Sequence, residues 1–324
     1  MMTAGTITRE QLEVRTTTST LNPANHLDHI LARWAVNREG HRVTPGLYAL
    51  GKTTPDSPVF VTANYTLSFD ALRSALNGRD AYILVLDTKG INVWCAAGKG
   101  TFGTDELVDR IEVTRLAEVV NHRNLILPQL GAPGVSGFEV TKRTHFKVEY
   151  GPVRAHDLPE YLISRSATPE MRRVHFTLLD RLTLIPVEFV SVLLILIALL
   201  LIGSRGPAAA VVAGTVLLPL LLPWLPTHDL STKGFILGGL VALAFAITAF
   251  MKSPGSALWL RSAGALSYLL LIPSITAFLA LNFTGSTTFT SRTGVRREMF
   301  AYIPVMAWMF GAGLLLNIAV IIFR

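Results

Sequence analysis

Five long apolar stretches dominate the C-terminal part of the chain, and only short polar breaks separate them. Each stretch is about 17–25 residues long, the length that a helix needs to cross the hydrocarbon core of a bilayer. Backbone polar groups cannot face lipid unpaired, so we expect the stretches to be helices and the breaks to be loops. The five stretches are Leu184–Gly203, Pro207–Pro226, Phe235–Met251, Ser262–Leu281 and Met299–Phe323.

The remainder of the chain has the composition of a soluble domain. Residues 1–184 contain 21 Lys and Arg and 19 Asp and Glu, whereas residues 185–324 contain only 8 and 3. This division predicts a soluble domain over residues 1–165, a juxtamembrane helix or linker over 166–184 and a five-helix transmembrane domain over 185–324. A disordered chain, a collagen and a purely soluble enzyme are excluded. The excess positive charge lies between apolar runs, which indicates membrane topology rather than nucleic-acid binding.

Positive residues near the ends of the apolar stretches predict the orientation, because Lys and Arg concentrate in cytoplasmic loops. The first twenty residues lack an apolar core and predict no signal peptide, and a single cysteine suits a reducing compartment. We therefore expect a multi-pass protein of the inner, cytoplasmic membrane, with the soluble domain in the cytoplasm and the C-terminus outside. With the N-terminus inside, the inner flanks carry Arg165, Arg172, Arg173, Arg181, Lys233, Arg292, Arg296 and Arg297, and the outer flanks carry Arg205, Lys252, Arg261 and Arg324.

Strand and helix patterns alternate in the soluble part, which predicts an α/β fold with a mainly parallel sheet. Ligands bind such sheets at the carboxyl ends of the strands. The unusual segments TANYT, GINVWCAAGK and PQLGAPG all fall there. We expect strands at Val59–Thr62, 81–87, Leu125–Leu127 and within 146–153. We expect helices over Phe69–Leu76, over 105–122 with Thr104 as cap, from Asp157 to Leu162, and from Thr168 with Pro169 in its first turn.

The only cysteine lies in the segment NVWCAAGK, directly after a predicted strand. Asn92 is a natural helix cap, which places Cys95 at the third helical position, and Lys99 follows one turn later on the same face. The small residues Ala96, Ala97 and Gly98 suit a helix against which a flat, bulky group packs. This pattern favours a cysteine that binds metal or reacts, although a small buried apolar residue remains the alternative.

NVWCAAGK resembles, over all eight residues, the cap-helix motif of the membrane-bound corrinoid proteins of microbial mercury methylation, whose five C-terminal spans also match. The segments VTANYTLSFDAL, PQLGAPG, GFEV and GPVRAHDLPEYL resemble the corrinoid domain of the corrinoid iron–sulfur protein of the acetyl-CoA pathway. The four-cysteine iron–sulfur motif of that protein is absent from this sequence, and so is the DxHxxG motif of other B12 domains.

The resemblance implies a Rossmann-like domain that binds a corrinoid of cobalamin type, in its methylcobalamin form, beneath the cap helix. It implies that Cys95 is the lower axial ligand of cobalt and the catalytic residue. His26 and His29 are spaced as metal ligands, but without a third ligand we expect a surface or capping role. The implied cofactor-binding residues are Thr62, Asn64, Tyr65, Thr66, Asn92, Val93, Trp94, Cys95, Ala96, Ala97, Gly98, Lys99, Pro128, Gln129, Leu130, Gly131, Ala132, Pro133, Gly134, Gly151, Pro152 and Val153.

The resemblance also implies methyl transfer to Hg(II), because a soft thiolate opposite the methyl group suits an electrophilic acceptor. One cysteine cannot hold an iron–sulfur cluster, so the expected reductant is a separate small ferredoxin with two 4Fe–4S clusters. The other expected partners are a methyl donor of methyl-folate type and membrane lipid, and no nucleic acid. Three alternatives stay open: a tethered methyl carrier with a non-mercury acceptor, a corrinoid-binding membrane sensor, and a thiol enzyme with Cys95 as nucleophile.

Overall fold

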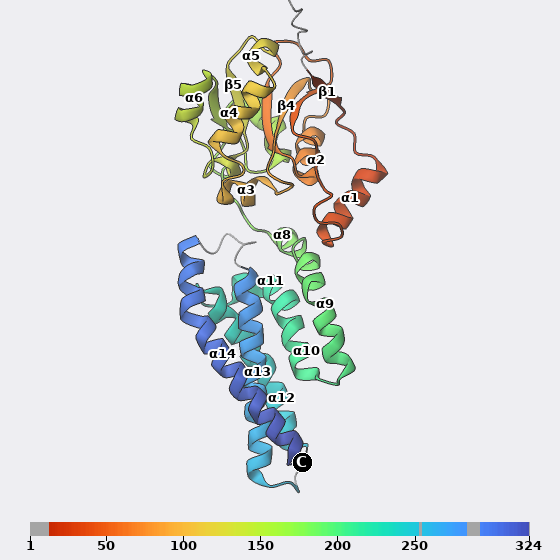
Figure 1. The fold of residues 1–324 in the computed structure, drawn as a ribbon, viewed down its shortest axis with the longest axis vertical. Coiled ribbons are helices and arrows are strands. Elements are labelled where there is room, and N and C mark those ends of the chain that lie inside the picture. Colours follow the sequence, from red (N-terminus) through yellow and green to blue (C-terminus); the bar gives the residue numbers. More distant parts are fainter. Residues whose placement is uncertain (1–12, 253–254, 284–291, 324) are drawn as a thin grey trace, which may run out of the picture. The chain divides into compact units, whose positions relative to one another are not determined.

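The structure is a computed structural model that describes residues 13–252, 255–283 and 292–323. It divides into two compact units (Figure 1). The first contains the chain up to Ala32 and from Val36 to Val174, and the second contains Arg33–Ala35 and the chain from His175. Each unit is described by itself. Some residues on which the topology prediction depends lie outside the described residues. These are residues 1–12, 284–291 and Arg324.

A six-stranded mixed sheet forms the centre of the first unit, in the order β1-β2-β4-β3-β5-β6. Strands β3, β4, β5 and β6 are mutually parallel, β2 is antiparallel to β4, and β1 is parallel to β2. The predicted α/β fold with a mainly parallel sheet is confirmed, and two N-terminal strands are added to it. The strands are β1 (Val14–Thr17), β2 (Gly46–Leu50), β3 (Val59–Ala63), β4 (Ala81–Leu86), β5 (Asn124–Leu127) and β6 (Lys147–Tyr150).

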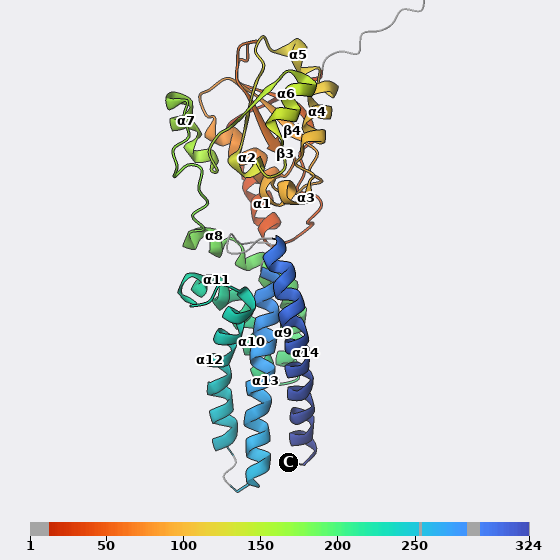
Figure 2. The same ribbon diagram turned by 90° about the vertical axis from the view of Figure 1, so that its left-hand side faces the viewer.

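The two central strands are buried along their whole length, as the continuous apolar runs VFVTA and AYILVL predict. Helices cover both faces of the sheet (Figure 2). One core joins the sheet to α3, α4 and α6, and the other joins it to α2 and α7. The helical segments are α1 (Pro23–Arg33), α2 (Thr66–Ala75), α3 (Val93–Lys99), α4 (Thr104–Val113), α5 (Leu116–Val119), η1 (Gln129–Gly131), α6 (Gly137–Thr144), η2 (Ala155–Asp157) and α7 (Leu158–Ser164).

Two helix predictions in this unit are wrong. The helix expected over 105–122 breaks at Arg115, whose φ of 47° is left-handed, and its N-cap is Gly103 rather than Thr104. The Thr104 hydroxyl instead accepts a hydrogen bond from the backbone of Ser136 at 2.9 Å.

The helix expected from Thr168 is a single turn. Met171 is buried in the core of the first unit, and its carbonyl accepts a 2.7 Å hydrogen bond from the Val153 backbone. This packing ties the segment to the sheet unit and stops the helix. Regular helix begins at Leu178, where Thr177 and Asp180 form a reciprocal capping box.

Within its described residues, the second unit contains five helical segments long and apolar enough to cross a membrane. Gly234 and Gly238 allow α12 to pack closely on α13, since a Cβ would lie 2.5 Å from the Ala277 Cα and 2.7 Å from the Pro273 Cα, respectively. The five spans are Leu178–Leu201, Arg205–Trp224, Leu230–Met251, Leu258–Asn282 and Thr293–Ile322. The individual elements are α8 (Leu178–Leu182), α9 (Ile185–Leu201), α10 (Arg205–Val212), a π-helical turn η3 (Ala213–Leu217), α11 (Leu218–Leu221), η4 (Leu222–Trp224), α12 (Leu230–Met251), α13 (Leu258–Asn282) and α14 (Arg292–Ile322).

Candidate functional site

The carboxyl ends of β4, β3, β5 and β6 lie side by side at one edge of the sheet. The chain leaves β3 toward β4 and leaves β5 toward β6, so the connections diverge between β3 and β5. Such a switch point is where open α/β sheets form ligand crevices. All four predicted site segments lie at these strand ends: 62–66 begins within the last two residues of β3, and 92–99, 128–134 and 151–153 follow β4, β5 and β6.

Helix α3 presents Cys95 as predicted. Asn92 caps the helix, and its side-chain oxygen accepts a 2.9 Å hydrogen bond from the Cys95 backbone N–H. Cys95 is therefore the third helical residue. Its thiol is free and partly exposed, so it remains accessible for a ligand. The helix ends at Gly100, which adopts a left-handed φ of 86°.

The opposite face of α3 packs against the loop after β5. Ala96 and Ala97 are buried in the core. A Cβ on Gly134 would lie 2.1 Å from the Phe102 carbonyl oxygen and 3.0 Å from the Ala97 Cα. Small residues at Ala97 and Gly134 are therefore required for α3 to dock on this loop. Gly98 differs, because a Cβ there would meet nothing within 4 Å.

Asn64, at the end of β3, organises the loop that leads into α3. Its side-chain oxygen accepts hydrogen bonds from the backbone and hydroxyl of Thr88 and from the Gly90 backbone, at 2.9–3.1 Å. Its amide nitrogen donates to Asp87 at 3.2 Å. Asn64 is buried, and these four bonds hold the β4–α3 loop. A cofactor contact by its side chain stays a prediction.

Thr66 forms a hydrogen bond to the Asp28–His41 pair, a contact that the sequence pattern did not predict. Its hydroxyl donates to Asp28 at 2.6 Å, and Asp28 also contacts the His41 ring at 2.7 Å. The other His41 ring nitrogen donates to the Val36 carbonyl at 2.7 Å. Burial opposes protonation of His41, but the bonds to Asp28 and Val36 outweigh it and raise the His41 pKa above its usual value near 6.5.

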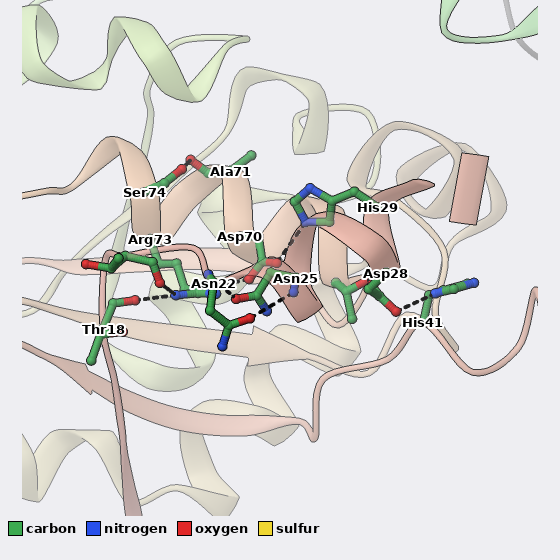
Figure 3. A network of polar contacts seen from close by, with 12 residues as sticks. Thr18, Asn22, Asn25, Asp28, His29, His41, Asp70, Ala71, Arg73 and Ser74 are labelled. Carbon is green, nitrogen blue, oxygen red and sulfur yellow. Dashed lines mark hydrogen bonds and ion pairs between the residues drawn. The ribbon is translucent and has the colours of Figure 1, made fainter. Parts of the chain in front are cut away.

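Figure 3 shows this contact beside a second one on α1, in which His29 lies 2.8 Å from the Asp70 carboxylate. Asp70 also accepts a 2.6 Å bond from Arg73, which in turn donates to the Thr18 carbonyl at 2.5 Å. His29 thus joins α1 to α2 with its ring largely buried, so the surface or capping role expected for it is wrong.

The loops after β5 and β6 support each other. The Gln129 backbone donates to the Pro152 carbonyl at 3.3 Å, and the Gln129 side chain accepts from Arg172 at 2.8 Å. A larger residue in place of Gly151 would be crowded, since its Cβ would lie 3.3 Å from Ile126 Cγ2. Arg172 lies in the segment wrongly expected to be helical, so its contact with this loop was not predicted.

Two observations bear on what the site can bind. Among the described residues, the Thr101 hydroxyl just beyond α3 is the one buried side-chain polar atom without a hydrogen-bond partner. Such a group is rare in a folded protein, and an ordered water is one way to satisfy it. The described residues contain no cluster of three or more His, Cys, Asp or Glu suited to a metal ion. The free, partly exposed thiol of Cys95 can supply a single soft ligand to a metal.

Comparison with known proteins points to the same region. Residues 27–161 match the family model of the CO dehydrogenase/acetyl-CoA synthase delta subunit. The gamma subunit of the acetyl-CoA decarbonylase/synthase complex of Archaeoglobus fulgidus is 37% identical over 114 residues, which cover 35% of this chain and 24% of that protein. The gamma subunit from Methanopyrus kandleri is 35% identical over 127 residues, covering 39% and 27%.

The chain thus spans about a quarter of the length of these curated relatives. The family match ends at residue 161 and includes all the predicted site residues, but none of the five long apolar helices. The α/β unit that carries Cys95 is therefore related to the subunits of the acetyl-CoA decarbonylase/synthase complexes.

Proposed function

We propose that this chain is a membrane-tethered corrinoid protein that transfers methyl groups, and that its acceptor is Hg(II). The observation that carries the proposal is the capped, partly exposed Cys95 at the carboxyl edge of a parallel sheet. The sheet unit is related to proteins named for acetyl-CoA synthesis and decarbonylation. The eight-residue resemblance around Cys95 supports the finer choice of acceptor.

The residues present fit a corrinoid. Cys95 offers a soft sulfur donor, and the open space beside Gly98 leaves room for a flat group against the exposed face of α3. In a Rossmann-like arrangement of β3–β6, the loops 62–66, 128–134 and 151–153 would surround the same cofactor.

The protein's own task is to hold Cys95 in one position. Asn92 fixes the first turn of α3, and Ala97 and Gly134 lock the helix onto the loop after β5. Asn64 holds the incoming loop through four hydrogen bonds. When bound, the corrinoid would supply cobalt and a transferable methyl group, and the sulfur of Cys95 would make the metal more electron-rich. That electronic character suits the electrophile Hg(II) better than a nucleophilic acceptor.

This chemistry also determines which reductant and methyl donor the protein would need. Hg(II) would receive the methyl group together with its electron pair, so sustained turnover would require two electrons and a new methyl group for each methylmercury formed. A small ferredoxin with two 4Fe–4S clusters and a methyl donor of methyl-folate type would supply them. The five apolar helices would anchor the protein in the inner membrane, and the distribution of Lys and Arg favours a cytoplasmic sheet unit.

The proposal is tested with the purified full chain loaded with methylated corrinoid under reducing conditions. We expect methylmercury formation from Hg(II), loss of this activity in Cys95→Ala, and no loss in Ser164→Ala, which removes one surface hydroxyl on α7. Failure of the folded protein to bind corrinoid would overturn the proposal. Corrinoid binding and methyl loading without methylmercury formation would favour a carrier with another acceptor. Binding without methyl loading would favour a sensor.

A further inference from the structure

The second unit keeps its carboxylates at one end. Each acidic residue of the sequence beyond His175 lies in α8, in the first turn of α9, just before α12, or near the start of α14. These positions belong to the end of the bundle where the chain enters α9. The four residues are Asp180, Glu188, Asp229 and Glu298.

The opposite end carries only positive charge. Here α9 and α12 finish and α10 and α13 begin, and the chain places Arg205, Lys252 and Arg261 at these junctions. Among the described residues, neither Lys252 nor Arg261 forms an ion pair with a carboxylate. An anion that binds at this end would therefore meet positive charge without competition from a carboxylate side chain of the described residues.

A cavity of about 660 Å³ opens beside these cations. Residues from α9, α10, α12, α13 and α14 line it, and Figure 2 shows α12, α13 and α14 along one side of this bundle. The wall is mainly apolar, with Leu199, Leu271, Phe310 and Leu314 among its residues. Its volume falls in the range of about 300–1,000 Å³ that small-molecule sites occupy.

Arg261 is held in place at the cavity. Its Nε donates to the Phe250 carbonyl at 2.7 Å, and its guanidinium lies 4.3 Å from the centre of the Phe250 ring. The terminal N–H groups of the Arg261 guanidinium are suited to hydrogen bonds with a phosphate. Nearby Trp259 is half exposed and packs edge-on against Phe323. An exposed tryptophan of this kind is typical of the boundary between lipid tails and headgroups.

We infer that this cavity binds one anionic phospholipid, with its phosphate at Arg261 and Lys252 and an acyl chain along the apolar wall. A zwitterionic lipid fits less well, because its own cation would enter an end of the bundle without carboxylates. An apolar peptide would leave both cations uncompensated. The inference rests on the membrane insertion proposed above, but not on the corrinoid chemistry.

The experiment uses the delipidated full chain, with bound lipid counted by native mass spectrometry during titration with phosphatidylglycerol or phosphatidylcholine. We expect tight binding of one phosphatidylglycerol and weaker binding of phosphatidylcholine. Arg261→Gln should lower phosphatidylglycerol affinity about tenfold, as expected for loss of hydrogen bonds to a charged group. Arg205→Gln makes the same charge change at the same end but outside the cavity lining, and should have little effect.

A second pair of variants tests the apolar wall without altering charge. Gly264→Phe places a ring in the cavity, whereas Gly239→Phe adds the same ring on α12 where a Cβ meets nothing within 4 Å. Only Gly264→Phe should exclude the lipid. Equal affinity for both lipids in the native chain, or unchanged phosphatidylglycerol affinity in Arg261→Gln or in Gly264→Phe, would overturn the inference. Release of the chain from membranes by alkaline carbonate would instead contradict the proposed membrane insertion.

Discussion

Replacing Gly134 by alanine tests whether the loop after β5 sets the position of α3. The new Cβ would lie 2.1 Å from the Phe102 carbonyl oxygen and 3.2 Å from the Ala97 Cβ. Backbone surrounds it, so no side chain can rotate away, and α3 or the loop must shift. Overpacking of this kind costs about 1–3 kcal/mol, against a gain of about 0.4–1 kcal/mol from a stiffer unfolded chain. We expect net destabilisation of about 1–2 kcal/mol.

Gly98→Ala is the matched control within the same helix. A Cβ at Gly98 meets nothing within 4 Å, so the substitution should stabilise the cofactor-free protein by about 0.5–1 kcal/mol through helix propensity alone. Gly98 also lies three residues after Cys95, on the same helix face. If a corrinoid packs there, the added methyl group should weaken corrinoid binding while it raises stability.

Hydrogen exchange measured by mass spectrometry on the full chain gives the local opening free energy of peptides from α3 and β5. Gly134→Ala should raise exchange in both, and Gly98→Ala should lower it in α3. Corrinoid affinity, measured by absorption titration, should fall in both variants. Unchanged exchange in Gly134→Ala would refute the tight docking of α3, and unchanged corrinoid affinity in Gly98→Ala would refute the proposed cofactor face.

Three further predictions follow from the local structure. Asn92→Ala should destabilise α3 by about 1 kcal/mol through loss of its cap and weaken corrinoid binding, whereas Asn92→Asp should retain most of both; hydrogen exchange of α3 and absorption titration measure this. The pKa of His41 is raised in the folded state. The stabilisation that protonated His41 provides is therefore complete below the pKa of His41 in the unfolded chain, and it is lost as the pH rises through the pKa of His41 in the folded protein. The stability of the first unit should fall over that range, and His41→Gln should flatten the urea-denaturation profile against pH. In a Cys95→Ala background, Ser204→Cys should react with a membrane-impermeant thiol reagent from outside the cell and Thr227→Cys only from inside; labelling of both from one side would contradict the orientation.

The features that sequence reasoning predicted are those set by neighbouring residues. The cap of Asn92 on Cys95 joins residues three apart, and the buried β3 and β4 follow from their own apolar runs. The five apolar helices depend on length and composition alone. Such local rules act before any tertiary contact forms, so a single sequence is enough to apply them.

The features that it missed depend on distant partners. Asp28, His41 and Thr66 meet only after α1 folds back onto the sheet. The good helix start at Thr168 is overridden because Met171 is buried against the sheet unit. The small size of Ala97 reflects the approach of Gly134, where the sequence suggested a bulky ligand. In each case, packing energy outweighed a local preference or supplied a reason that no local pattern contains.

The central claim is that Cys95 supplies the sulfur ligand to a corrinoid cobalt. X-ray absorption at the cobalt edge tests it most directly, on the full chain loaded with corrinoid in the oxidised Co(III) state. The account predicts a cobalt–sulfur distance in the native protein that disappears in Cys95→Ala and persists in Ser164→Ala. The same cobalt environment, without sulfur, in the native protein and in Cys95→Ala would contradict it.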